Sequence, residues 1–147
     1  MNNLFLLLAV VAGAGVTVQA IVNARLGAAF GAPIWGAMTQ FVVGLSILLL
    51  AVAVTRQPAP NTSSVGQLPW WLWTGGIFGA LFIFATVYLT PKFGAALTMS
   101  CAILGQLTAA VLIDHFGFFG ANVVRLSGTR LAGAVLLAAG VMLMRWR

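Results

Sequence analysis

The sequence has almost no acidic side chains and few charges of any kind. Its 147 residues include one acidic residue, Asp114, and one histidine, and charged residues make up 5% of the chain. Soluble domains carry about 25% charged residues, so this composition excludes an ordinary soluble fold. The chain has no His/Cys/Asp/Glu cluster, no nucleophile beside a base and no phosphate-binding loop. We therefore expect neither an enzyme nor a metal or cofactor site.

Cysteine and N-terminal positive charge are also scarce. Cys101 is the single cysteine and lies in an apolar run, so an intramolecular disulfide is excluded and a packing role is expected. The residues before the first apolar run, Met1-Asn2-Asn3, lack the basic n-region of a secretory signal. We therefore expect the first apolar segment to be retained as a membrane span.

What the chain does have is apolar sequence. Hydrophobic residues make up 62% of it, and its mean hydropathy is +1.10. A helix needs about 20 apolar residues to cross a bilayer, so the chain has room for four or five spans and no separate soluble domain. The sequence predicts an all-α membrane protein, with one five-helix transmembrane domain over residues 1–147. The expected spans cover residues 4–24, 34–55, 70–90, 95–113 and 127–144.

Turn-forming residues and tryptophans separate these spans. Pro33 suits the first turn of the second helix, and 56–69 is the one stretch with soluble-loop chemistry. The tryptophans at 70, 71 and 73 are typical of the headgroup region and open the third span. Residues 91–94 predict a tight hairpin, which makes the third and fourth spans antiparallel neighbours.

The first span carries a polar stripe. Gly15, Gln19 and Asn23 are spaced i, i+4 and i+8, so they share roughly 80° of arc on one face of a helix. The opposite flank is apolar and suits lipid. We interpret the stripe as one wall of a cavity.

The second span repeats this pattern, with Gln40 between Gly36 and Gly44. Gln106 adds a further neutral amide in the fourth span. At membrane depth, such amides either join helices through hydrogen bonds or line a pathway for a polar solute. We take Gln19, Asn23, Gln40 and Gln106 as the candidate substrate pathway. Candidate helix-packing positions are Gly15, Gly36, Gly44, Gly75, Gly79 and Gly105, of which Gly75 and Gly79 form a Gly-xxx-Gly pair.

Asp114 and His115 are expected to end the fourth span. A carboxylate at a helix C-terminus faces the negative end of the dipole and needs a cationic partner. Arg125 and Arg130 are the candidates by position. The group forms either a structural ion pair or a proton relay at one mouth of the pathway, and we favour the ion pair.

Arg25 is expected to close the first helix. A cation is favoured there by the dipole, and it can reach the headgroups or attract anions at the cavity mouth. Hydroxyls of Thr86, Tyr88 and Thr90 are weaker candidates for the cavity. Trp35 is interpreted as a headgroup-belt residue rather than a gate.

The positive charges show little asymmetry between the two sides of the membrane. The net charge is +6, but the cations are dispersed singly, which predicts lipid headgroups rather than nucleic acid as their partners. With five spans, one side receives three cations and the other receives four. The first side has Arg56, Arg125 and Arg130, and the second has Arg25, Lys92, Arg145 and Arg147. Because Lys and Arg bias sets orientation, either the chain inserts in both orientations and pairs antiparallel, or another feature decides its orientation; we favour the antiparallel homodimer.

Several stretches together resemble a known family. They are Gly15 to Gly27, Pro91 to Thr98, Gly105 to Gly117, and Arg130 to Val141. These residues are similar to the YdcZ-like proteins of the drug/metabolite transporter superfamily. The resemblance covers nearly the whole chain and implies a bacterial inner-membrane exporter built from half-sized, dual-topology units. The small multidrug resistance proteins have a similar layout but depend on a first-span glutamate, which this sequence lacks.

The leading hypothesis is a secondary transporter. It would export a small polar solute by alternating access in a dual-topology homodimer, with bilayer lipid and the solute as its other partners. A passive channel built from the same dimer is the alternative. A third hypothesis is a non-transporting membrane subunit of a larger complex.

Overall fold

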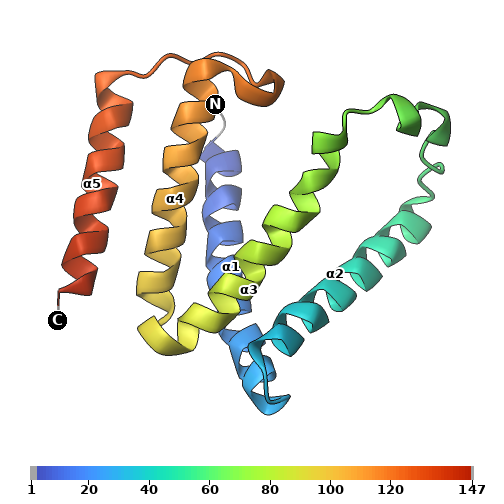
Figure 1. The fold of residues 1–147 in the computed structure, drawn as a ribbon, viewed down its shortest axis with the longest axis horizontal. Helices are drawn as coiled ribbons and strands as arrows, with labels where there is room; N and C mark the ends of the chain where they lie inside the picture. Colours follow the sequence, from blue (N-terminus) through green and yellow to red (C-terminus); the bar gives the residue numbers. More distant parts are fainter. Residues whose placement is uncertain (1–2, 147) are drawn as a thin grey trace. The chain divides into compact units, whose positions relative to one another are not determined.

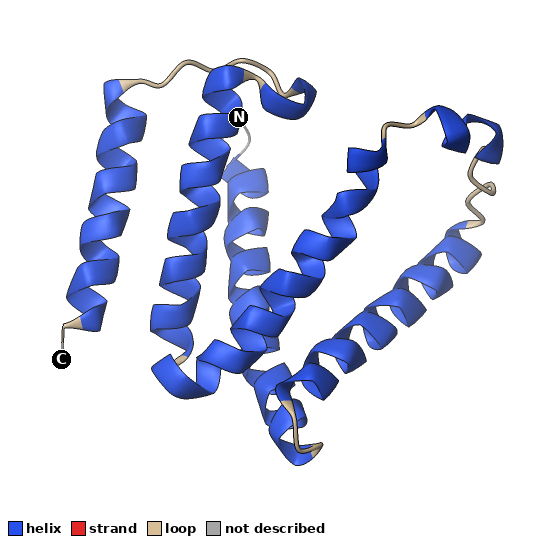
Figure 2. Cartoon of the chain, in the orientation of Figure 1, coloured by secondary structure: helices blue, strands red, loops and turns tan. Residues whose placement is uncertain are grey.

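The computed structural model describes residues 3–146, and its secondary structure over that range is helical (Figures 1 and 2). Five helices are long and apolar enough to cross a membrane, which confirms the predicted all-α membrane fold. They are α1 (Asn3–Ala29), α2 (Pro33–Thr55), α3 (Gly75–Phe93), α4 (Ala95–Phe116) and α5 (Gly128–Arg145). Three short 3-10 helices lie between them: η1 (Thr62–Gln67), η2 (Trp70–Thr74) and η3 (Phe118–Gly120).

The chain divides into two compact units after Lys92. The first unit contains α1, α2 and α3, and the second contains α4, η3 and α5. In the first unit, α1 and α2 form an antiparallel hairpin through the short turn 30–32 (Figure 1). In the second unit, α4 packs against α5.

The first helix is longer than the sequence predicted. It continues to Ala29, so Arg25 lies inside α1 and does not close it. The segment after Arg25 is rich in alanine, which favours the helix, and the turn comes at Gly31 with a φ of 82°. There the Gly31 N–H donates to the carbonyl of Ala28, and Pro33 then starts α2.

Two other boundaries also differ from the expectation. Pro91 was expected in a hairpin but lies within α3. The chain turns only at Gly94, which has a φ of 81°, a value that glycine adopts readily. Proline has no backbone N–H, so the Val87 carbonyl loses the helical hydrogen bond that residue 91 would otherwise donate. The fourth helix runs to Phe116, so Asp114 and His115 lie in its last turn and Gly117, with φ 67°, terminates it.

The hairpin of α1 and α2 is held by close contact between small residues. The buried residues of α1 lie within about 100° of one helix face. They are Ala20, Asn23, Ala24 and Gly27. Across from them, α2 buries Gly36 and Ala37. A Cβ added at Gly36 would lie 2.1 Å from the backbone oxygen of Asn23, so the backbones touch at a point where only glycine fits.

The third helix buries a mixed polar and apolar stripe. Thr86, Val87 and Thr90 are its buried residues, and Val87 is 1% exposed. Large apolar side chains elsewhere on the helices are exposed, including Leu7, Leu48 and Phe78. This distribution places apolar side chains toward lipid and small or polar side chains toward neighbouring helices.

Gly36→Ala should destabilise the hairpin of α1 and α2. The added methyl group must displace backbone, and overpacking of this kind costs about 1–3 kcal/mol. Thermal unfolding of the purified protein in detergent measures the loss. Gly76→Ala is the matched control, because a Cβ there meets no atom within 4 Å. Equal unfolding temperatures for the two variants would contradict close packing at Gly36.

Candidate functional site

Three of the four predicted amides line one pocket in the first unit. The pocket has a volume of about 390 Å³ and lies between α1 and α2. Gln19 and Asn23 line it from α1, and Thr39 and Gln40 line it from α2. Its other lining residues are apolar side chains and Gly44. We call it the amide pocket.

The helical repeat and one glycine place these amides together. Gln19 and Asn23 are one turn apart on the same face of α1. Gly36 lies one turn before Gln40 on α2 and allows the backbone contact with Asn23. At that crossing, Asn23 Nδ2 donates a hydrogen bond to Gln40 Oε1. The polar stripes of the two helices therefore meet.

The amide pocket retains unused hydrogen-bonding groups. The bond between Asn23 and Gln40 uses one donor hydrogen and one acceptor oxygen, which leaves the Gln40 NH₂ and the Asn23 carbonyl without side-chain partners in residues 3–146. Gln19 is half-buried and has no hydrogen bond to the described chain. Because unpaired polar groups are costly in hydrocarbon, they need a partner from water, a solute or a second subunit.

The other pathway and packing candidates are not part of this pocket. Gln106 belongs to α4 in the second unit, and its side chain is exposed. A Cβ added at any of five predicted packing glycines would meet no described atom within 4 Å, whereas Gly36 is in contact with α1. The five open positions are Gly15, Gly44, Gly75, Gly79 and Gly105.

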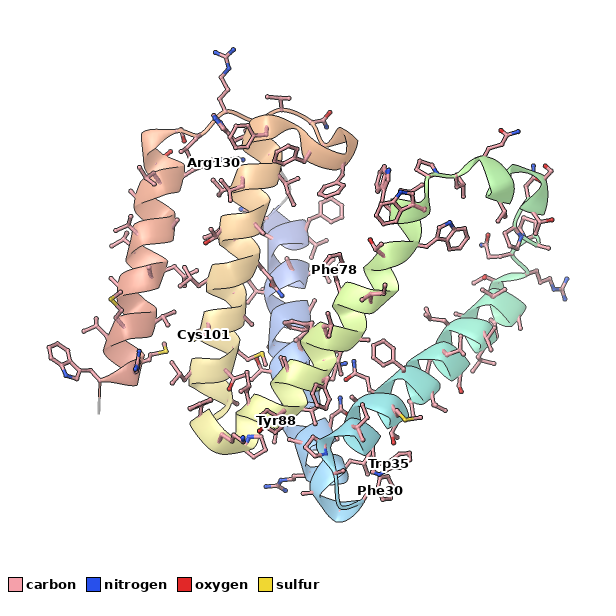
Figure 3. The ribbon with its side chains drawn as sticks, viewed as in Figure 1. Phe30, Trp35, Phe78, Tyr88, Cys101 and Arg130 are labelled. Carbon is pink, nitrogen blue, oxygen red and sulfur yellow. The ribbon has the colours of Figure 1, made fainter. Side chains whose placement is uncertain are left out.

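Asp114 forms an ion pair in the second unit. Arg130 Nη1 lies 3.1 Å from Asp114 Oδ2, and the two side chains are 39% and 37% exposed, respectively (Figure 3 labels Arg130). Asp114 lies near the C-terminus of α4, and Arg130 lies in the first turn of α5, so each charge faces the unfavourable end of its own helix dipole. Pairing offsets both effects. Arg125, the other candidate partner, is exposed.

His115 and the backbone of Asp114 hold the loop that follows α4. The Val124 N–H donates to the Asp114 carbonyl at 2.9 Å, and the Leu126 N–H donates to His115 Nδ1 at 3.1 Å. Ser127 then caps α5 by accepting from the Arg130 N–H at 3.3 Å. These hydrogen bonds fix the loop between the C-terminus of α4 and the N-terminus of α5.

The end of α3 carries a cation that is not among the site residues predicted from the sequence. Lys92 Nζ lies 3.6 Å from the centroid of the Tyr88 ring, which is a cation–π contact. Tyr88 projects near the C-terminal end of α3 (Figure 3). The signal in the sequence was the i, i+4 spacing of Tyr88 and Lys92, which puts the two side chains on one helix face. Trp35, at the start of α2, is 47% exposed.

These observations define a multi-pass membrane protein whose first unit carries a neutral polar pocket. The model of the family described as "Putative inner membrane exporter, YdcZ" matches residues 4–143, and the chain belongs to this family. The chain is also 26% identical over 146 residues to the Inner membrane protein YdcZ of Escherichia coli strain K12, covering 99% of this chain and 97% of that protein. The comparison with solved structures gives no match. The resemblance inferred from the sequence and the inner-membrane localisation are thereby confirmed.

Asp114→Asn and Arg130→Gln should be energetically coupled. Each variant removes one charge of a half-exposed pair, so a double-mutant cycle should give about 0.5–1 kcal/mol of coupling. Unfolding in detergent measures the four free energies. The same cycle with Arg125→Gln should give no coupling, because Arg125 does not contact Asp114 in the structure. Coupling to Arg125 instead of Arg130 would contradict the pairing.

Proposed function

We propose that this chain is a secondary transporter that exports a small polar solute, with the amide pocket as part of the solute pathway. The observation that carries the proposal is the amide pocket itself, which places unused hydrogen-bonding groups between two membrane-spanning helices. Membership in a family described as inner membrane exporters supports the direction of transport.

The lining of the pocket favours an uncharged or weakly charged solute. Among the described residues, no acidic, basic or histidine side chain lines it. Gln19, Asn23 and Gln40 offer both donors and acceptors. A solute with hydroxyl or amide groups would satisfy them, whereas a fully charged ion would find no countercharge.

An antiparallel homodimer would complete the pathway. The pocket is formed by one unit and lies on an open face of it, and Gln19 lacks a partner within the described chain. The five open glycines would permit close contact with a second copy. The nearly even distribution of cations, three against four, supports pairing of opposite orientations.

The ion pair of Asp114 favours a structural role over proton coupling. The carboxylate is held by Arg130 and does not line the amide pocket. Proton coupling through this group would require the pair to break in each cycle. Alternating access would then depend on helix movements around a neutral site, driven by the solute gradient or a coupled ion.

Labelling of the loop between α2 and α3 tests the dual topology. With Cys101→Ala as background, Ser63→Cys should react with an impermeant maleimide in about half of the copies in intact cells, and in all copies after permeabilisation. Phe30→Cys, in the turn at the opposite end of α2, is the matched variant and should also react by about half. Reaction of one position alone in intact cells would show a single orientation and refute the antiparallel dimer.

Gln19→Leu should reduce transport without destabilising the chain. The side chain makes no hydrogen bond to residues 3–146, so its loss should leave the unfolding temperature nearly unchanged. We expect at least a roughly tenfold fall in initial flux, because one to two solute hydrogen bonds are lost. The assay uses liposomes containing the purified protein and a panel of neutral solutes: glycerol, urea, amino alcohols and monosaccharides.

Thr17→Val is the control for polarity in α1. Its hydroxyl already donates to the carbonyl of Gly13, so removal should leave flux unchanged. Saturable counterflow would identify a carrier, whereas non-saturating flux would identify a channel. Equal flux for Gln19→Leu and the control would contradict the assignment of the amide pocket, and absence of flux across the whole panel would contradict the solute class.

A further inference from the structure

The cations of the first unit have no acidic partner. Asp114 is the one acidic side chain in the sequence, and it pairs with Arg130 in the second unit. Arg25 and Lys92 belong to the first unit, where the described residues include no carboxylate. Two cations at one end of a membrane-spanning unit therefore lack an internal countercharge.

Arg25 and Lys92 line two adjoining pockets between α1 and α3. One pocket, of about 240 Å³, is lined by Tyr88 and Lys92, and the other, of about 290 Å³, is lined by Arg25 and Thr90. Residues common to both linings are Ala24, Ala28 and Pro91. The amide pocket lies around a different face of α1, because Ala28 is roughly 180° from Gln19 about the helix axis.

Thr90 contributes a buried hydroxyl with no partner. It is 7% exposed, and its Oγ1 is the buried side-chain oxygen that lacks a hydrogen bond in the described chain. Six other hydroxyls of the described helices donate to the carbonyl four residues earlier. They belong to Thr17, Thr39, Ser46, Thr55, Thr98 and Thr108. An unpaired hydroxyl beside a cationic pocket is costly unless a ligand accepts its hydrogen bond.

The N-terminus of α2 adds favourable electrostatics. Gly31, Ala32 and Pro33 line the pocket that contains Lys92, and the N-cap residue Ala32 makes no side-chain hydrogen bond to the start of the helix. The N-terminus of a 23-residue helix carries about half a positive charge and attracts anions. The C-termini of α1 and α3 bring partial negative charge to the same end, but the two full cations outweigh it.

We propose that Arg25 and Thr90, which line the same pocket, form a binding site for an oxyanion, a phosphate or carboxylate group, and that Lys92 in the adjoining pocket adds electrostatic attraction. Arg25 and Lys92 would supply the charge, and the Thr90 hydroxyl would donate a hydrogen bond. The Tyr88 ring holds the Lys92 ammonium beside the first pocket. The apolar remainder of the walls suits a ligand with an attached hydrocarbon, such as an anionic lipid, as well as a free anion. This site does not depend on the proposed transport of a neutral solute.

Binding to the purified full chain in non-ionic detergent tests the site. The probes are dihexanoyl phosphatidylglycerol, with dihexanoyl phosphatidylcholine as its zwitterionic match, and sodium phosphate, with sodium chloride at equal ionic strength. Native mass spectrometry counts bound ligand, and the thermal shift gives the apparent Kd. The unfolding temperature of each variant is first measured without ligand. If a glutamine variant fails to fold, Arg25→Lys or Lys92→Arg replaces it and preserves the charge.

The expected result is selective loss of anion binding. Combined Arg25→Gln and Lys92→Gln should weaken binding at least roughly tenfold, because one charge-assisted hydrogen bond and a second nearby cation are removed. Thr90→Val should weaken it by about threefold with no change of charge. Arg56→Gln, which removes an exposed cation outside both pockets, should have no effect.

The two probes distinguish the source of the anion. Site-dependent binding of phosphatidylglycerol alone identifies a lipid headgroup, and site-dependent binding of phosphate identifies a free oxyanion; either supports the site. Equal binding of phosphatidylcholine, equal loss in Arg56→Gln, or no loss in Thr90→Val and the double variant would overturn it.

Discussion

The contact between Gly36 and the backbone of Asn23 sets the arrangement of the first unit. Because any side chain at position 36 would overlap the Asn23 carbonyl, α1 and α2 approach more closely there than large side chains would allow. That approach brings the Asn23 and Gln40 amides within hydrogen-bonding distance. The amide pocket depends on this contact, since a wider separation of the helices would leave each amide facing lipid alone.

The shortage of acidic side chains is the second constraint on this molecule. Asp114 is already held by Arg130, so the remaining cations must be neutralised by lipid, solute or ligand. Cations at helix ends can reach headgroups without any special site. Thr90 distinguishes the end of α3 from that general case, because a buried hydroxyl without a partner needs a specific acceptor.

The sequence alone predicted the five helices, the family and the common face of Gln19 and Asn23. The helices and this face could be predicted because apolar length and helical periodicity depend on local sequence. Side-chain contacts between different helices were harder to predict from the sequence. Asp114 had two candidate partners by position, and the choice of Arg130 follows from the path of the loop at 117–127, which periodicity does not describe. The boundary at Pro91 was wrong, because α3 continues through the proline to Phe93 in spite of the hydrogen bond lost there. Lys92 was not singled out from the sequence, because its place in a pocket between α1 and α3 depends on how these helices pack.

A single helix forms a wall of both the neutral amide pocket and the cationic pockets. Asn23, Ala24 and Arg25 are consecutive, and their side chains leave α1 about 100° apart. Asn23 lines the amide pocket, Ala24 lines both cationic pockets, and Arg25 lines one of them. Rotation of α1 about its axis would therefore change both sites together. Because Asn23 is also fixed by Gln40 and by the contact at Gly36, such a rotation would have to carry α2 with it.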